Sequence, residues 1–342
     1  MVICVHVSQA VPDAPSLVKQ VGYYGMFGVQ LFFVLSAFSL SLAYGQSFRY
    51  LSWDFLRFMI RRWFRIAPLY LLGIALYYFL RESSGDTQPA ATSILYHSFL
   101  LHGLIPSAFE QVVPGGWSIG CEWAFYLAFP MAHTFAMNQS PKATLGLSIL
   151  SSVCYPLALY AIGKNMPIRG WSFLTLNFGC QAPCFLLGLA AHASWNRGIR
   201  YASTALFSVL CFGLLANGLV KIAGPAASLA SPFLCGITFA SGTLLALQYQ
   251  IQSVVLKWIG NISYSIYILH FIFTSYLLNS SWFTHSGISW FWRLAAAFIL
   301  TVLGSTLLAS ITHHLIESPS IKAGKWLCLH LRPDTSHSIP KH

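Results

Sequence analysis

The chain has 342 residues, of which 56% are hydrophobic and only 8% are charged. Its mean hydropathy is +0.64. So little charge excludes a soluble globular domain, because such a domain needs a charged surface to stay in solution. The net charge of +11 does not indicate nucleic-acid binding in so apolar a chain, because lysines and arginines in the loops of a membrane protein set its orientation and contact anionic lipid.

Apolar segments recur along nearly the whole sequence, at lengths near the ~20 residues that cross a bilayer. They predict an all-α fold, a polytopic bundle of about ten transmembrane helices with the first one truncated. The bundle forms one domain, residues 1–320, followed by a basic cytoplasmic tail, 321–342. The expected spans are 1–10, 27–45, 62–80, 118–137, 144–163, 172–194, 202–221, 229–250, 262–279 and 293–316.

Two segments do not fit the pattern of full spans. Residues 1–10 are apolar but far too short to cross a membrane, so either the beginning of this helix is missing from the sequence, which we favour, or the helix is unusually stunted. The stretch 93–105 is also apolar and short, which favours a re-entrant or interfacial helix.

The lysine and arginine residues indicate the orientation of the bundle. With the N-terminus in the cytoplasm, most of the 19 basic residues fall in cytoplasmic segments, as the positive-inside rule requires. The C-terminus is then cytoplasmic as well, and the loop 81–117 faces outward. The sequence therefore predicts a multi-pass protein of the cell membrane, specifically the bacterial inner membrane, in contact with membrane lipid.

An arginine cluster precedes the third span at its cytoplasmic mouth. Arg61, Arg62 and Arg65 are three and four residues apart, so their side chains occupy neighbouring positions on a helix. Guanidinium groups that converge at a membrane surface suit a ligand that carries phosphates. An anchor that contacts lipid headgroups explains the same pattern, and both interpretations remain open.

Glu122 is the only acidic residue inside a long apolar run, Trp117–Pro130. An ionised group within a membrane span costs roughly 2.5–3.5 kcal/mol or more, so it usually has a partner and a function. Entering from outside, Glu122 lies about one turn into its span, which predicts a place in the outer part of the membrane. The alternative is a hydrogen bond or ion pair that joins helices.

His6 lies on the first span and, in this orientation, also in the outer part of the membrane. A histidine oriented by a carboxylate is a common general base. We therefore predict that His6 and Glu122 form a catalytic pair, on the opposite side of the membrane from the arginine cluster. The alternative is that His6 is a hydrogen-bonding core residue. His270, inside the ninth span, is a weaker candidate.

Five stretches of the chain form an ordered series of motifs that covers nearly its whole length. They are Gly28–Ser36, Arg62–Tyr70, Trp117–Tyr126, Ile262–His270 and Ile316–Lys322. In this order they resemble the second-helix signature, the paired-arginine motif, the Trp-Ser-x-x-x-Glu segment, a late helix and the closing motif of the membrane acyltransferase 3 family. The basic residue that this family places upstream of the first-helix histidine has no counterpart here, and Ala37 and Trp123 are smaller departures.

The resemblance implies an O-acyltransferase, as in the O-acetylation of polysaccharides. The expected co-substrate is acyl-CoA, acetyl-CoA in the first place, with no metal, and the acceptor is a hydroxyl of an extracytoplasmic glycan or glycolipid. His6 and Glu122 would be catalytic, and Arg61, Arg62 and Arg65 would hold the phosphates of the donor. The residues assigned to substrate binding are Gln30, Trp117, Ser118, Tyr126, Tyr264 and His270.

Other functions fit parts of the same pattern. A transporter or flippase of lipid-linked sugars also needs buried charge, but such proteins often contain internal repeats and paired broken helices, which the sequence does not show. A family member with only a structural role is a third interpretation. Within the enzyme interpretation, direct transfer and a covalent acyl-histidine intermediate are both compatible with the residues. The sequence names neither the acceptor, the acyl length nor the oligomeric state.

Overall fold

The computed structural model describes residues 1–44, 53–108, 112–163, 175–198, 225–249, 252–278, 283 and 287–331. These residues form helices and irregular connections without any strand, which confirms the all-α prediction. The longer helices are α3 (Gly28–Tyr44), α4 (Trp53–Ser84), α6 (Trp117–Asn138), α7 (Pro141–Gly163), α9 (Phe178–Asn196), α11 (Pro225–Gln248), α12 (Val254–Phe271) and α14 (Trp290–Thr312).

The shorter elements connect or extend these helices. They are α1 (Val2–Gln9), α2 (Ser16–Tyr23), α5 (Ala91–Ser98), α15 (Ser318–His330), the 3₁₀ turns η1 (Tyr24–Phe27) and η2 (Pro106–Ala108), and the π-helical segments η3 (Ile272–Leu277) and η4 (His313–Glu317).

Four helical stretches in the described part of the chain are long and apolar enough to cross a membrane. They match four of the predicted spans, and support a membrane protein, whereas the total of ten spans stays a prediction. The predicted span 202–221 lies outside the described residues. The four stretches are Ser16–Tyr44, Trp53–Ser84, Ala230–Gln248 and Trp290–His330.

Local sequence signals set where two of the helices begin. The side chain of Asn177 accepts a hydrogen bond from the amide of Cys180 (3.1 Å), and Ser253 accepts one from the amide of Leu256 (3.3 Å). Each cap satisfies one of the amides that a helix N-terminus leaves without a partner. Helix α12 therefore begins at Val254, eight residues before the expected span, because the cap and not the hydropathy defines its start.

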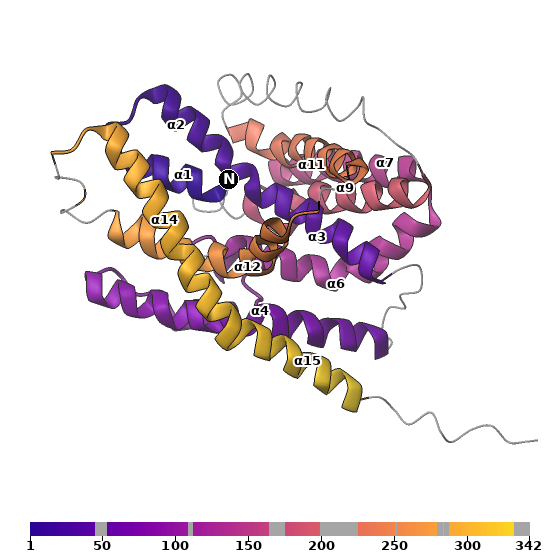
Figure 1. The fold of residues 1–342 in the computed structure, drawn as a ribbon. Helices are drawn as coiled ribbons and strands as arrows, with labels where there is room; N and C mark the ends of the chain where they lie inside the picture. The colour runs from indigo at the N-terminus through magenta and orange to yellow at the C-terminus, as the bar shows by residue number, and fades with distance from the viewer. Residues whose placement is uncertain are drawn as a thin grey trace, which may run out of the picture.

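The helices form two groups with α6 between them (Figure 1). Helix α9 packs against α3, α7 and α11 in one group, and α12 packs against α14 in the other. Helix α6 contacts both α9 and α4. Beyond α14 the chain continues as α15, which lies along α4 (Figure 1). The residues just after the last span, including the start of the predicted tail, therefore form a docked helix.

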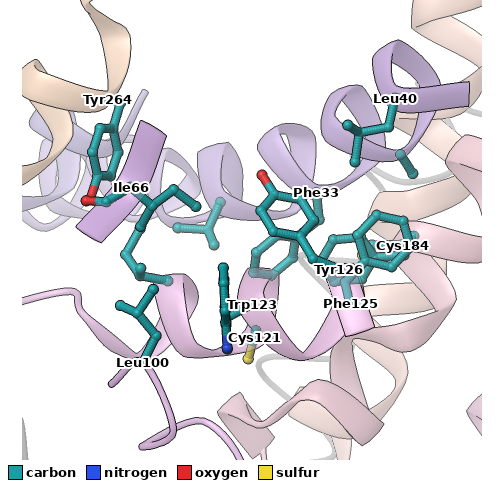
Figure 2. Close-up of a cluster of buried hydrophobic side chains, with 14 of the residues drawn as sticks. Phe33, Leu40, Ile66, Leu100, Cys121, Trp123, Phe125, Tyr126, Cys184 and Tyr264 are labelled. Atoms are coloured by element: carbon teal, nitrogen blue, oxygen red, sulfur yellow. The ribbon is translucent and has the colours of Figure 1, made fainter. Parts of the chain in front are cut away.

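The core lies between α3, α6 and α9 and consists largely of aromatic rings. The ring of Phe185 is 4.1 Å from that of Phe125 and 4.6 Å from that of Phe33, measured between centroids. Figure 2 shows Phe33, Phe125 and Tyr126 gathered in this region. By contrast Leu303 on α14 is 64% exposed. An apolar side chain exposed on the outer face of an apolar helix is suited to contact with lipid.

The segment between α5 and α6 folds back into the bundle. Val113 and the loop residue Leu100 are fully buried, and Leu100 adopts a left-handed backbone (φ 60°) where α5 ends. Gly103 packs directly on the backbone of Gly120, since a Cβ at Gly103 would lie 2.3 Å from the carbonyl carbon of Gly120. The predicted re-entrant or interfacial helix at 93–105 is thus a helix only as far as Ser98, followed by an irregular loop that is partly buried.

This loop decides where α6 starts relative to α4. The hydroxyl of Tyr70 lies against Gly116, the residue before α6. At ~1.5 Å of rise per residue, Tyr70 is roughly 20 Å along the axis from Ser84, where α4 ends. Helix α6 therefore begins deep inside the bundle and not at its surface.

Candidate active site

Glu122 lies on α6 and is 3% exposed. Its carboxylate accepts a hydrogen bond from the hydroxyl of Ser36 on α3 (2.9 Å) and another from the hydroxyl of Tyr126, one turn further along α6. The carboxylate thereby links α3 to α6. Both bonds are made to one oxygen, Oε1.

The guanidinium groups of α4 lie beside this carboxylate. Arg62 places its guanidinium carbon 5.7 Å from the ring centroid of Phe58 and 5.8 Å from that of Tyr126. Arg62 and Arg65 both interact electrostatically with Glu122. Opposite charges attract each other more strongly where water is scarce. Glu122, Tyr126 and the two arginines therefore form one cluster, which we call the carboxylate–guanidinium cluster.

The three predicted arginines do not behave alike. Arg62 and Arg65 are partly buried, whereas Arg61 is exposed. The Nε of Arg62 is buried and has no hydrogen-bond partner among the described residues. Such a free donor is available to an anionic ligand.

His6 lies against α12 at a separate place. Its ring centroid is 4.5 Å from that of Phe271 and 5.5 Å from that of His270. Helix α1 is held there by packing against α2, α14 and α12. Two histidines from distant parts of the sequence thus meet, and we call them the imidazole pair.

The predicted pairing of His6 with Glu122 is wrong in its geometry. The hydrogen bonds of Glu122 in the described structure go to Ser36 and Tyr126, and the ring of His6 faces α12. The expected separation of Glu122 from the arginine cluster is also wrong, because the two are neighbours. The physical reason is the re-entrant loop, which starts α6 deep in the bundle and brings Glu122 to the level of the arginines.

Ser118 and Tyr267 lie between the two sites. The hydroxyl of Tyr267 donates to the carbonyl of Gly115 (2.9 Å) and lies 2.8 Å from Oγ of Ser118. Ser118 is one helical turn before Glu122, on the same face of α6. Tyr267 precedes His270 by one turn of α12, with ring centroids 5.9 Å apart. Polar side chains therefore run through the apolar bundle from Arg62 to His6.

The remaining predicted substrate-binding residues hold helices together. Trp117 packs edge-on against Phe33, with centroids 6.2 Å apart. The amide of Gln30 donates to the side-chain oxygen of Gln181 (3.2 Å). The hydroxyl of Tyr264 donates to the carbonyl of Ile66 (2.9 Å), and Figure 2 shows these two residues side by side. A role for them in binding substrate stays a prediction.

Sequence reasoning missed a buried group formed by Tyr70, His97 and His102. The two imidazoles are stacked with centroids 3.8 Å apart, and the hydroxyl of Tyr70 is 2.7 Å from Nδ1 of His97. Nε2 of His102 donates to the carbonyl of Gly116 (2.9 Å), which fixes the residue before α6. Burial and the neighbouring His97 lower the pKa of His102 to about 3. Two histidines within one short apolar stretch, 93–105, were the available signal.

In the part of the chain that the structure describes, no three His, Cys, Asp or Glu side chains lie close enough to hold a metal ion together.

A family model described as an acyltransferase domain, acyltransferase 3, matches residues 1–310. The chain belongs to this family. The resemblance inferred from the sequence motifs is thereby confirmed, and the matched region is an enzyme domain that transfers acyl groups.

Three relatives support this assignment. The chain is 27% identical over 340 residues to the "Putative peptidoglycan O-acetyltransferase YrhL" of Bacillus subtilis (strain 168), covering 86% of this chain and 50% of the relative. It is 24% identical over 328 residues to "Acyltransferase MdmB" of Streptomyces mycarofaciens, covering 87% of this chain and 81% of that relative. "Nodulation protein 10" of Rhizobium leguminosarum bv. viciae is 23% identical over 321 residues, covering 86% and 82%. The chain thus spans half the length of the first relative, and no solved structure matches it significantly.

Proposed function

We propose that this chain is an integral-membrane O-acyltransferase that moves an acyl group, acetyl in the first place, from cytoplasmic acyl-CoA to a hydroxyl of an extracytoplasmic glycan or glycolipid. The observation that carries the proposal is the series of polar side chains through an otherwise apolar bundle. This series begins with the guanidinium groups of Arg62 and Arg65 and ends with the imidazoles of His6 and His270. The family and the name of the Bacillus subtilis relative support the reaction class.

The donor is assigned to the guanidinium end. CoA carries phosphates, and guanidinium groups form strong charge-assisted hydrogen bonds with them. Arg62 and Arg65 are partly buried beside Tyr126, and Nε of Arg62 is free within the described structure. Arg61 is exposed and has at most an outer contact with the donor. The pantetheine arm of the donor would extend from there towards Ser118 and the imidazole pair.

The acceptor is assigned to the imidazole end. In the reaction, the acceptor oxygen bonds to the acyl carbon while the carbon–sulfur bond of the thioester breaks. The hydroxyl proton leaves through an imidazole and ends on the departing sulfur, so that the products are an ester and free CoA. His6 takes part in this proton transfer, because imidazole is the side chain whose ordinary pKa suits both steps.

The role of Glu122 differs from the one that the sequence suggested. Its carboxylate bonds to Ser36 and Tyr126 and lies beside the guanidinium groups of Arg62 and Arg65. We assign it to positioning these arginines for the donor phosphates. A carboxylate also offsets the positive charge that two guanidinium groups would otherwise bring into an apolar bundle.

The proposal is tested with the purified protein in lipid vesicles, supplied with acetyl-CoA and a glycan acceptor. Release of one CoA for each acetylated hydroxyl is the expected result. Acceptor transport without CoA release would instead establish the transporter or flippase function.

The donor site is tested by replacing both Arg62 and Arg65 with alanine. Two lost charge-assisted hydrogen bonds predict a KM for acetyl-CoA that rises on the order of 10- to 100-fold. The matched control is Lys257→Ala, because Lys257 is an exposed basic residue on α12 away from the cluster. A KM unchanged in the double variant would remove the donor from this site.

A further inference from the structure

His270 has one ring nitrogen that is fixed and one that is free. Its Nδ1 lies 2.7 Å from the carbonyl oxygen of Tyr267 and 3.2 Å from that of Ile266. A carbonyl oxygen can only accept a hydrogen bond, so Nδ1 carries the proton. In a neutral imidazole the other nitrogen, Nε2, then presents a lone pair.

This lone pair is buried without a partner. His270 is 1% exposed, and its Nε2 has no hydrogen-bond partner among the residues that the structure describes. Folded proteins rarely leave a buried polar atom unsatisfied, because burial removes its hydrogen bonds to water. The usual reasons for such an atom include a catalytic role or a ligand that completes the site.

The surroundings of His270 point to chemistry as well. The π-helical segment η3 begins two residues later, at Ile272, and such segments occur frequently at functional sites. The ring of His6, on α1, lies 5.5 Å from the ring of His270, measured between centroids. His6 is less buried, and its side chain bonds to Gln9 of the same short helix. Of the two imidazoles, His270 is therefore the one whose neutral ring is held in a single tautomer, with the lone pair on Nε2.

We infer that His270 is a second catalytic histidine, whose Nε2 takes the proton of the acceptor hydroxyl. This inference rests on the proposed acyl transfer and deepens it. As the hydroxyl oxygen bonds to the acyl carbon, its O–H bond breaks and the proton moves to Nε2. The imidazolium keeps its Nδ1 bond to the carbonyl of Tyr267, which stabilises the added charge.

The rest of the reaction restores His270. The carbon–sulfur bond breaks, and the electron pair leaves with the sulfur as a thiolate. The proton on Nε2 passes through the adjacent His6 to this thiolate, which becomes the thiol of CoA. No other reactant is needed, and both imidazoles return to their neutral state. The imidazole pair thus does the work that the sequence had suggested for a histidine and a carboxylate.

The decisive variant is His270→Asn. Its side-chain amide retains a donor for the carbonyl of Tyr267 and lacks any counterpart of Nε2. We expect kcat to fall on the order of 10²- to 10⁴-fold, with the KM for acetyl-CoA changed by less than about twofold because the donor site is elsewhere. A wild-type kcat in this variant would overturn the inference and leave the proposed function intact.

Chemical rescue separates a catalytic role from a structural one. His270→Ala leaves space for added imidazole, and its transfer rate should rise with imidazole concentration. His192→Ala is the matched control, since His192 on α9 is also buried (6% exposed) with an unpartnered Nδ1 in the described structure, but packs on Phe38. The control should keep the wild-type rate and show no rescue. A lack of rescue at His270, in a folded variant, would contradict the inference.

A second measurement does not depend on turnover. ¹⁵N NMR of histidine-labelled protein identifies the signals of His270 by their loss in His270→Asn, and reports which ring nitrogen carries the proton. The inference requires the proton on Nδ1. A proton on Nε2 would overturn it even if no transfer were observed, whereas a correct tautomer without CoA release by the wild type would instead refute the proposed function.

Discussion

The carboxylate–guanidinium cluster and the imidazole pair differ in how their buried atoms are satisfied. Glu122 accepts two hydrogen bonds and lies beside two positive charges, whereas Nε2 of His270 has no partner in the described structure. A charge with its partners in place keeps helices and ligand-binding groups in position. A free lone pair is ready to accept a proton. The most unusual residue of a sequence therefore need not be the one that reacts.

The largest effect is expected at the imidazole pair. His6→Ala removes the imidazole that passes the proton to the thiolate, so transfer should fall on the order of 10²-fold or more. The measurement is acetyl transfer by purified protein in vesicles, with the elution profile in size-exclusion chromatography as the check of folding. Retention of the wild-type rate would exclude His6 from the reaction, and the imidazole pair would then not be the place of proton transfer.

The pH dependence of stability tests the loop that separates the two regions. Because the pKa of His102 is lowered to about 3 from its ordinary ~6.5, the unfolded chain binds more protons than the folded one between these values. The free energy of unfolding should therefore decrease as the pH is lowered through this window, by up to about 1.4 kcal/mol per pH unit.

This dependence is measured by denaturant unfolding in detergent between pH 7 and pH 4. In His102→Gln the amide can still donate to Gly116 but does not titrate, so the curve should be flatter than that of the wild type. Equal slopes in the two proteins would show that His102 is not buried as a neutral group, and that α6 is not held at this depth by the loop.

Gly115 tests the close packing beside the imidazole pair. Its backbone has φ +72°, and a Cβ there would lie 2.9 Å from both the ring of Phe271 and the hydroxyl of Tyr267. Gly115→Ala should lower the free energy of unfolding by about 1–2 kcal/mol. The control is Gly146→Ala on α7, where nothing lies within 4 Å of the added atom and helix propensity favours alanine. An unchanged free energy of unfolding in Gly115→Ala would mean that Phe271 and Tyr267 do not pack closely on this glycine.

The smallest effect is expected from Ser36 in the carboxylate–guanidinium cluster. Ser36→Ala removes one of the two hydrogen bonds to Glu122, which predicts a loss of about 1 kcal/mol of stability and a modest rise in the KM for acetyl-CoA. Thermal unfolding and initial rates measure the two quantities. A fall in kcat with an unchanged KM would instead assign the carboxylate to the acid–base chemistry, and would contradict its role in donor binding.

Much of the helical framework could be predicted from hydropathy. The predicted span 62–80 lies within α4, and 118–137 agrees with α6 to within a residue at each end. The start of α4 extends beyond its span, because Trp53–Arg61 mixes apolar and charged residues and packs partly against α15, where Sγ of Cys328 contacts the carbonyl of Arg57. Apolar content identifies what a bilayer can accommodate, and it does not show where a mixed segment continues as helix.

The depth of Glu122 could not be predicted in this way. Its level depends on the path of the loop between α5 and α6, which is only partly buried in protein and whose composition equally fits an interfacial helix. Helix α5 contributes His97 and this loop contributes His102, and the two histidines have no distinctive spacing. By contrast, the proximity of Arg62 and Arg65 follows directly from helical periodicity. Contacts within a helix are encoded locally, and contacts between helices depend on the whole fold.

We propose that Glu122 supports donor binding whereas His6 takes part in the proton transfer. The most direct measurement is the equilibrium binding of coenzyme A to Glu122→Gln and to His6→Ala, which needs no turnover. We expect the Kd to rise about tenfold in Glu122→Gln, a loss of roughly 1.4 kcal/mol of binding free energy, and to stay within about twofold of wild type in His6→Ala. An unchanged Kd in Glu122→Gln, or a raised Kd in His6→Ala alone, would refute this division of roles.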